Sequence, residues 1–229
     1  MIINSIIIID EMKSINFLLA FVVFIFIANC ATGQTLTDEE KQIFRDRVEA
    51  KVLEFQDGLQ SVVNDQLSRS VRTEYTKNVL GLFIGKGEPY SLLEYGRKIS
   101  HSAVKMQTSS INHSRITTQK VKEYLYKLFD PATGRSKMRY SKIRMEFSDA
   151  VRVDNIEKVG DHYECTAYYC QKFIGYGPDG QIKYGEDLTW KKIRCYITYT
   201  KVPNGPDNNK LGFWDAKLGD IFVVSTEKL

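Results

Sequence analysis

The sequence has 229 residues, of which 43% are apolar and 26% are charged, and it carries a formal net charge of +4. This near-average composition excludes collagen-like, low-complexity and disulfide-knot proteins. The charge is too small to indicate a nucleic-acid partner, and an aromatic content of 12% is enough to build a core.

The N-terminal region has the features of a signal peptide. Residues 17–28 form an unbroken apolar run, FLLAFVVFIFIA, which is shorter than the roughly 20 residues that span a bilayer as a helix. It has the length of a signal-peptide core, and Lys13 supplies the positive charge that precedes such a core. We therefore predict a signal peptide over residues 1–33 with the true start at Met12. An uncleaved N-terminal anchor is the alternative.

Two processing sites are consistent with this segment. Ala31-Thr32-Gly33 is a small-x-small triplet whose cleavage would release residues 34–229. Alternatively, Ile27-Ala28-Asn29-Cys30 resembles a bacterial lipobox, in which Cys30 would be lipidated and Asn29 departs from the usual small residue. We expect an exported protein, periplasmic or extracellular, with an outer-membrane lipoprotein as the alternative. The membrane would then be contacted only through the signal peptide or the lipid anchor.

The first half of the mature chain has helical periodicity. Thr37 and Glu40 have capping-box spacing, and an apolar stripe begins at Phe44 and recurs every three or four residues to Val62. A second stripe runs from Leu67 to Phe83 and stops at a glycine-rich segment. A short strand near 102–109 and a short helix over 121–129, capped by Thr117 and Thr118, are expected to follow.

After residue 135 the period changes from about 3.6 to 2. Residues 142–147 alternate as a half-buried strand does, and the runs 163–176 and 188–202 are joined by the turn Gly177-Pro178-Asp179-Gly180. A turn over 203–209 and a closing strand over 221–226 complete the pattern. This order predicts a single α+β domain over residues 34–229, with N-terminal helices packed on a long, strongly bent antiparallel sheet.

The order of elements over residues 37–226 resembles the nuclear-transport-factor-two-like, or cystatin-like, cone fold of ketosteroid isomerase, scytalone dehydratase and the SnoaL-like cyclases. The resemblance implies a pocket inside the cone and a homodimer formed through the sheet. No family catalytic residue maps onto a named position. The sequence is also similar to exported domains of unknown function from Gram-negative bacteria.

Aromatic residues gather in the second half of the chain. The candidates for a pocket or an interaction surface are Tyr168, Tyr169, Trp190, Tyr199 and Trp214, since tyrosine and tryptophan combine apolar area with a polar tip. The alternative is that strands simply favour aromatic residues.

Three cysteines remain in the mature chain, Cys165, Cys170 and Cys195. No CxxC pair or metal-ligand spacing occurs, so no metal and no cofactor are expected. A turn centred near Pro178-Asp179 places Cys165 and Cys195 on one face of neighbouring strands. An exported protein could join them in a disulfide; buried reduced thiols are the alternative.

Three functions fit these features. The first is a non-enzymatic binding or interaction domain for a small apolar ligand or a protein partner. The second is a pocket enzyme of isomerase, dehydratase or cyclase type, with an acid such as Asp187 or Glu164 buried among tyrosines. The third is a component of an envelope assembly with an exposed apolar sheet face. A cavity in which a carboxylate or histidine lies within hydrogen-bond reach of a tyrosine would favour the enzyme.

Overall fold

The computed structural model describes residues 36–110, 113–148, 150–185, 187–201 and 212–228. The chain divides into two units, residues 1–41 and residues 42–229. The predicted signal peptide, Cys30 and the turn over 203–209 lie outside the described residues. None of the helices within these ranges combines the length and the apolar character needed to cross a membrane.

Helix α2 (Asp38–Val63) begins with the predicted capping box. The Thr37 amide donates to the Glu40 carboxylate at 2.8 Å, and the Glu40 amide donates to Thr37 Oγ1 at 3.2 Å. The predicted apolar stripe is buried from Phe44 to Val62. Helix α3 (Arg69–Leu82) follows, capped by Ser68, and a short 3-10 helix η1 (Ile84–Gly87) forms the glycine-rich exit.

Helix α4 (Val121–Leu128) buries Val121, Tyr124, Leu125 and Leu128, as the periodicity predicts. The expected cap is wrong, because the N-cap residue is Lys120 and no side chain caps the helix. Thr117 and Thr118 lie instead in strand β4 (His113–Lys120), where they pair with Thr108 and Gln107. Threonine favours strands, and here that preference outweighs its use as a cap.

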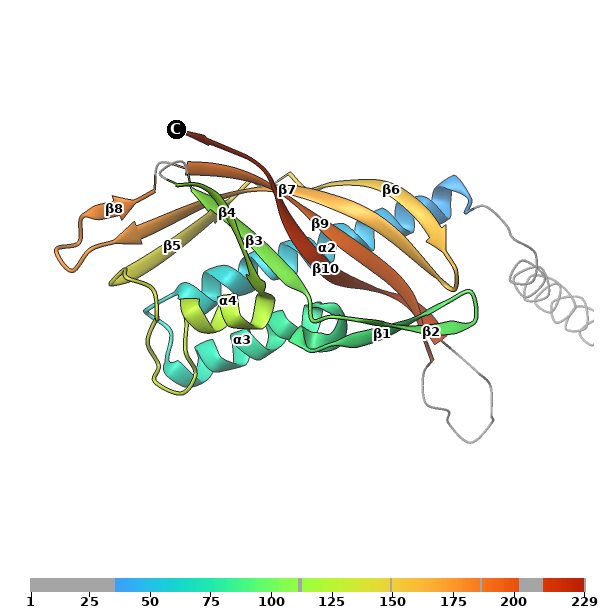
Figure 1. Ribbon diagram of the computed structural model, residues 1–229, viewed down its shortest axis with the longest axis horizontal. Helices are drawn as coiled ribbons and strands as arrows, with labels where there is room; N and C mark the ends of the chain where they lie inside the picture. Colours follow the sequence, from blue (N-terminus) through green and yellow to red (C-terminus); the bar gives the residue numbers. More distant parts are fainter. Residues whose placement is uncertain (1–35, 111–112, 149, 186, 202–211, 229) are drawn as a thin grey trace, which may run out of the picture. The chain divides into compact units, whose positions relative to one another are not determined.

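Among the described residues, the main sheet has eight strands and is open, because its outermost strands β4 and β5 do not pair with each other (Figure 1). Its central path is β4-β3-β10-β9-β7-β5, and β6 and β8 pair with β7. The remaining bounds are β3 (Lys105–Ser110), β5 (Lys142–Phe147), β6 (Arg152–Val159), β7 (His162–Tyr176), β8 (Ile182–Tyr184), β9 (Asp187–Lys201) and β10 (Gly212–Lys228).

The α+β class is confirmed, but the sheet is mixed rather than wholly antiparallel. Strand β10 pairs with β9 in the predicted antiparallel sense and with β3 in parallel, through Ile221 and Met106. These two residues are more than a hundred positions apart, and such long-range pairing leaves no local signal. A separate hairpin, β1 (Tyr90–Glu94) and β2 (Arg97–His101), was also not anticipated. Its turn residues Tyr95 and Gly96 have φ values of 50° and 75°, as a tight hairpin turn requires.

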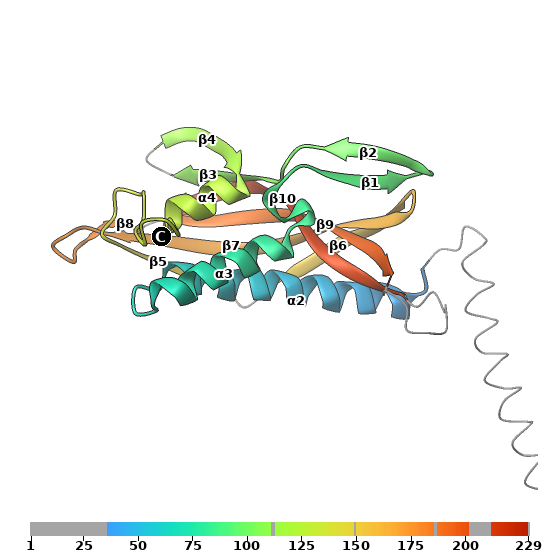
Figure 2. The ribbon, with the colours of Figure 1, turned by 90° about the horizontal axis from the view of Figure 1, so that it is seen from below.

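Strand β7 separates a core-facing side of the sheet from an outward side. Tyr163, Cys165, Ala167 and Tyr169 alternate along one side and are all buried. The Phe55 ring of α2 meets the Tyr169 ring edge-on at 6.3 Å, and Figure 2 shows α2 running alongside β7 with α3 between α2 and α4. From Tyr163 to Tyr169, the sheltered positions of β7 therefore lie on this core-facing side.

Candidate functional site

A cavity of about 230 Å³ opens on the core-facing side of the sheet, between residues of β3, β7, β9 and α4. Strands β3, β7, β8 and β9, helix α4 and the loop between α4 and β5 all contribute to its wall. Among the lining residues are Thr108, Tyr124, Met138, Tyr140, Gln171, Phe173, Tyr184, Asp187, Thr189 and Lys191. The wall therefore combines aromatic rings with a larger number of polar and charged side chains, which can orient a bound small molecule.

Lys191 is the most unusual residue of the cavity. It is 3% exposed, and its ammonium group forms no hydrogen bond or ion pair with the part of the chain that the structure describes. It occupies a core-facing position of β9, opposite Tyr169 of β7. Burial lowers the pKa of the Lys191 ammonium to about 8, because the charged form loses its hydration and gains no compensating partner.

Two other polar side chains lie buried near Lys191. Gln171 is 4% exposed, and its carbonyl oxygen has no hydrogen-bond partner within the described residues. The Tyr169 hydroxyl is likewise buried without a partner in that part of the chain. Burial raises the pKa of both the Tyr169 and the Tyr124 phenols, so both stay neutral. Unsatisfied buried polar atoms are costly and often mark the place of a missing partner.

A second polar group lies at the other end of the cavity. The Tyr184 hydroxyl of β8 donates a hydrogen bond to the buried Asp187 carboxylate of β9. Burial, and then this hydrogen bond, raise the pKa of the Tyr184 phenol. Asp187 and Lys191 are four residues apart on one side of a strand, so their Cα atoms are separated by about 13 Å. The cavity therefore has a cationic end and an anionic end.

Three aromatic rings form the wall beside Asp187. The Tyr140 ring lies 5.7 Å from Phe173 and 6.2 Å from Tyr184, and Phe173 lies 5.8 Å from Tyr184, centroid to centroid. Tyr140 can reach this position because residue 175 of β7 is glycine. A Cβ atom on Gly175 would lie 2.6 Å from two carbons of the Tyr140 ring. The glycine thus leaves room on the strand for the Tyr140 ring, which forms part of the cavity wall.

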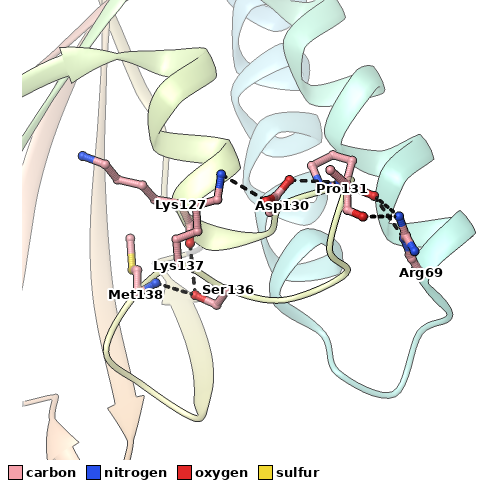
Figure 3. A network of polar contacts seen from close by, with 8 residues as sticks. Arg69, Lys127, Asp130, Pro131, Ser136, Lys137 and Met138 are labelled. Atoms are coloured by element: carbon pink, nitrogen blue, oxygen red, sulfur yellow. Dashed lines mark hydrogen bonds and ion pairs between the residues drawn. The ribbon is translucent and has the colours of Figure 1, made fainter.

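The loop that carries Tyr140, Arg139 and Met138 is held by a network of polar contacts (Figure 3). Asp130 forms an ion pair with Lys137 at 3.0 Å and accepts a hydrogen bond from the Ala132 amide at 2.9 Å. Ser136 donates to the Lys127 carbonyl at 3.0 Å and accepts from the Met138 amide at 3.0 Å.

The same loop is tied to a second helix. Arg69 of α3 donates to the carbonyl of Pro131 at 2.7 and 3.0 Å and to that of Ala132 at 2.5 Å. The Ala132 amide, and then Lys137, lower the pKa of Asp130. These contacts hold in place the loop that forms one wall of the cavity, which favours a preformed site.

The five aromatic candidates from the sequence lie in three places, and none lines this cavity. Tyr169 is part of the core. Tyr168 and Trp190 lie on the outward side, where Trp190 is 41% exposed and the Arg152 guanidinium covers the Tyr168 ring at 4.7 Å. Tyr199 and Trp214 form an edge-on pair at 5.5 Å at the far end of β9. Of the two outward residues, Trp190 is the more exposed, and the cavity is lined by other residues.

The two cysteines predicted to face each other are direct cross-strand partners, Cys165 in β7 and Cys195 in β9. Both are buried and reduced in the structure, and their contact with each other, followed by burial, raises the pKa of the Cys195 thiol. A disulfide between them stays a prediction. Its formation on export would be seen as the loss of two hydrogens in the intact mass.

The sequence pointed to Asp187, with Glu164 as its alternative, but not to Lys191, Gln171, Tyr140, Phe173 or Tyr184. Lys191 had a local signal, because it interrupts the core-facing series that continues with Ile193, Cys195 and Ile197. A charged residue at a buried position of a strand is rare and needs a reason. The signal was hidden because Lys192 follows it, and two adjacent lysines look like a solvated edge.

No group of three or more histidine, cysteine, aspartate or glutamate side chains able to hold a metal ion occurs within the described ranges. Comparison with family models, curated proteins and solved structures finds no match for this chain. The functional evidence is therefore the geometry of the site itself.

Proposed function

We propose that this protein binds a small organic molecule in the Lys191 cavity. The single observation that carries the proposal is Lys191 itself, a buried cation that faces a cavity and has no partner within the described residues. A lysine in this state lowers the stability of the fold, and perturbed titratable groups in clefts concentrate at functional sites. A ligand oxygen would supply the missing partner.

The two ends of the cavity define the class of ligand. Lys191 favours a carbonyl or carboxylate oxygen, whereas Asp187 with Tyr184 favours a hydroxyl or amine. The rings of Tyr140 and Phe173 favour a flat apolar body between these ends. A phenolic or similar ring acid, with an oxygen acceptor at one end and a hydroxyl at the other, has this pattern.

The test is calorimetric titration with benzoate, 4-hydroxybenzoate and 4-hydroxycinnamate. Affinity should rise along this series, because only the longest probe spans from Lys191 toward Asp187. Lys191→Met should weaken binding at least tenfold. Lys192→Met is the matched control, since Lys192 is exposed on the opposite side of the same strand, and it should bind as the native protein does. Equal binding by both variants would refute the proposal.

A pocket enzyme is the second candidate, and one observation favours it: a buried carboxylate, Asp187, is hydrogen-bonded to a tyrosine inside the cavity. Such a pair suits proton transfer next to a carbonyl group. The test is deuterium exchange at the α-carbon of carbonyl ligands, followed by NMR. Exchange that is lost in Asp187→Asn would support an isomerase, dehydratase or cyclase type of reaction, and its absence from the native protein would leave a binding protein.

Three broader expectations stand as proposals beside this one. The apolar run at 17–28 supports export, and the outward aromatic residues support a homodimer or an envelope partner. The order of helices before the long sheet, with a cavity on the helix-facing side, supports a cone-like wall of the nuclear-transport-factor-two-like kind. Fold alone would not fix the activity, so the Lys191 site carries the functional argument.

A further inference from the structure

We propose that Lys191 binds its ligand covalently, by forming a reversible imine with an aldehyde or ketone carbonyl. This inference rests on the proposed function, since it concerns the same cavity, and it narrows the ligand class from oxygen acceptors in general to carbonyl compounds. It adds a chemical step to a binding site.

The position of Lys191 supports this step. The side chain lines the cavity and is 3% exposed, so its amine faces the ligand space rather than bulk solvent. No carboxylate is paired with it within the described residues, whereas a lysine held in an ion pair would stay protonated. Arg139 also lines the cavity, but a guanidinium does not lose its proton and forms no imine under these conditions.

The ionisation of Lys191 supports the same step. With its pKa lowered to about 8, about a tenth of the amine is neutral at pH 7, compared with about 0.03% for an ordinary lysine. The neutral amine is the nucleophile, so Lys191 has a roughly 300-fold advantage over surface lysines from ionisation alone. Desolvation is the sole cause of the shift.

The titratable groups around Lys191 do not reverse the lowering of its pKa. Tyr169 from β7 and Tyr124 from α4 have raised pKa values and are neutral near pH 7. Asp187 lies on the same strand at a distance of about 13 Å between Cα atoms, and Tyr184 of β8 donates to it. Arg139 also lines the cavity, but it is exposed on the loop and is not a cause of the lowered Lys191 pKa.

The reaction balances without an oxidant or a cofactor. The Lys191 nitrogen forms a bond to the carbonyl carbon, the C=O π electrons move to oxygen, and a proton passes from nitrogen to that oxygen. The resulting carbinolamine loses its hydroxyl group and one further proton as water, and a C=N bond forms. The apolar rings around the cavity limit the water that would reverse this step.

The experiment uses 4-hydroxycinnamaldehyde as the probe, with sodium cyanoborohydride to reduce any imine to a stable secondary amine. The purified protein is treated at pH 7, and adducts are located by intact mass and peptide mapping. We expect one adduct per chain, at Lys191, with at least tenfold higher occupancy than at Lys192. Lys191→Met should lose this adduct, and Lys192→Met should keep it.

Two results would overturn the inference. In one, adducts spread over surface lysines without enrichment at Lys191. In the other, Lys191 stays unmodified although 4-hydroxycinnamate still binds by calorimetry. The second result leaves the proposed function standing and removes only the imine, whereas loss of calorimetric binding together with labelling would remove both. Since the native protein is mapped directly, the result does not depend on how a variant folds.

Discussion

Lys191 and Lys192 are neighbours in β9, yet they lie in opposite environments. Lys191 is buried in the cavity, whereas Lys192 is exposed on the outward side, with its ammonium 5.8 Å from the centre of the Phe222 ring. Successive residues of a strand point to opposite sides of the sheet. One step along the chain therefore separates a perturbed amine from an ordinary one, and the same contrast applies to Tyr169 and Tyr168 in β7.

The largest expected difference between the two sides is in packing. Tyr169 is fully buried, with its ring near Phe55 and Phe147. We expect Tyr169→Ala to lower the free energy of unfolding by about 3–5 kcal/mol, because it opens a cavity in the core. Tyr168→Ala, on the outward side, should cost about 1 kcal/mol or less. Urea denaturation measures both, and similar losses would contradict the two-sided interpretation.

Substitution of Lys191 should change the free energy of unfolding in the opposite direction. A pKa that falls from 10.5 to about 8 on folding corresponds to about 3 kcal/mol of lost stability at pH 7. Lys191→Met removes this cost and keeps an apolar chain of similar length. We expect the variant to be about 1–3 kcal/mol more stable at pH 7 and to bind its ligand at least tenfold more weakly. Lys192→Met should change neither property, and a destabilised Lys191→Met would show that the ammonium has a partner after all.

The pH dependence of stability sharpens this comparison. The folded pKa of Lys191 lies below the unfolded value, so the unfolded state binds more protons between pH 8 and 10.5, and the free energy of unfolding rises with pH in that window. Between pH 8 and pH 9 the rise should be about 1 kcal/mol. This rise should be absent from Lys191→Met. Subtracting the variant's pH profile from the native profile removes the contribution of the tyrosines, which titrate at higher pH. A flat native profile would contradict the lowered pKa.

The local features of the fold were predictable from the sequence. The capping box of Thr37 and Glu40, the buried stripe from Phe44 to Val62, and the facing of Cys165 and Cys195 each follow from periodicity or turn position over a short stretch. The parallel pairing of Ile221 with Met106 was not predictable, because nothing near either residue specifies a partner so distant in the chain.

The candidate site was also only partly predictable, because local patterns do not show which distant residues meet. Asp187 among tyrosines was anticipated, and the structure places it against Tyr184. The aromatic candidates were chosen by residue type, which does not show which side of a strand is sheltered or where a loop such as the one carrying Tyr140 will fold back. Lys191 carried the most specific signal, a charge in series with Ile193, Cys195 and Ile197, but the adjacent Lys192 hid it, and the register of β7 and β9 makes it plain.

The smallest expected effect concerns Trp190. Its side chain is 41% exposed on the outward side, so Trp190→Ser should change the free energy of unfolding by about 0.5 kcal/mol or less. Ligand affinity should not change, because the cavity is on the other side of the sheet. Sedimentation measurements on the same variant examine the predicted homodimer. A dimer formed through this side would weaken, whereas an unchanged oligomeric state would show that the outward aromatic residues are not a self-association surface. The two sides of β9 would then differ in function as well as in burial, with ligand chemistry confined to the side of Lys191.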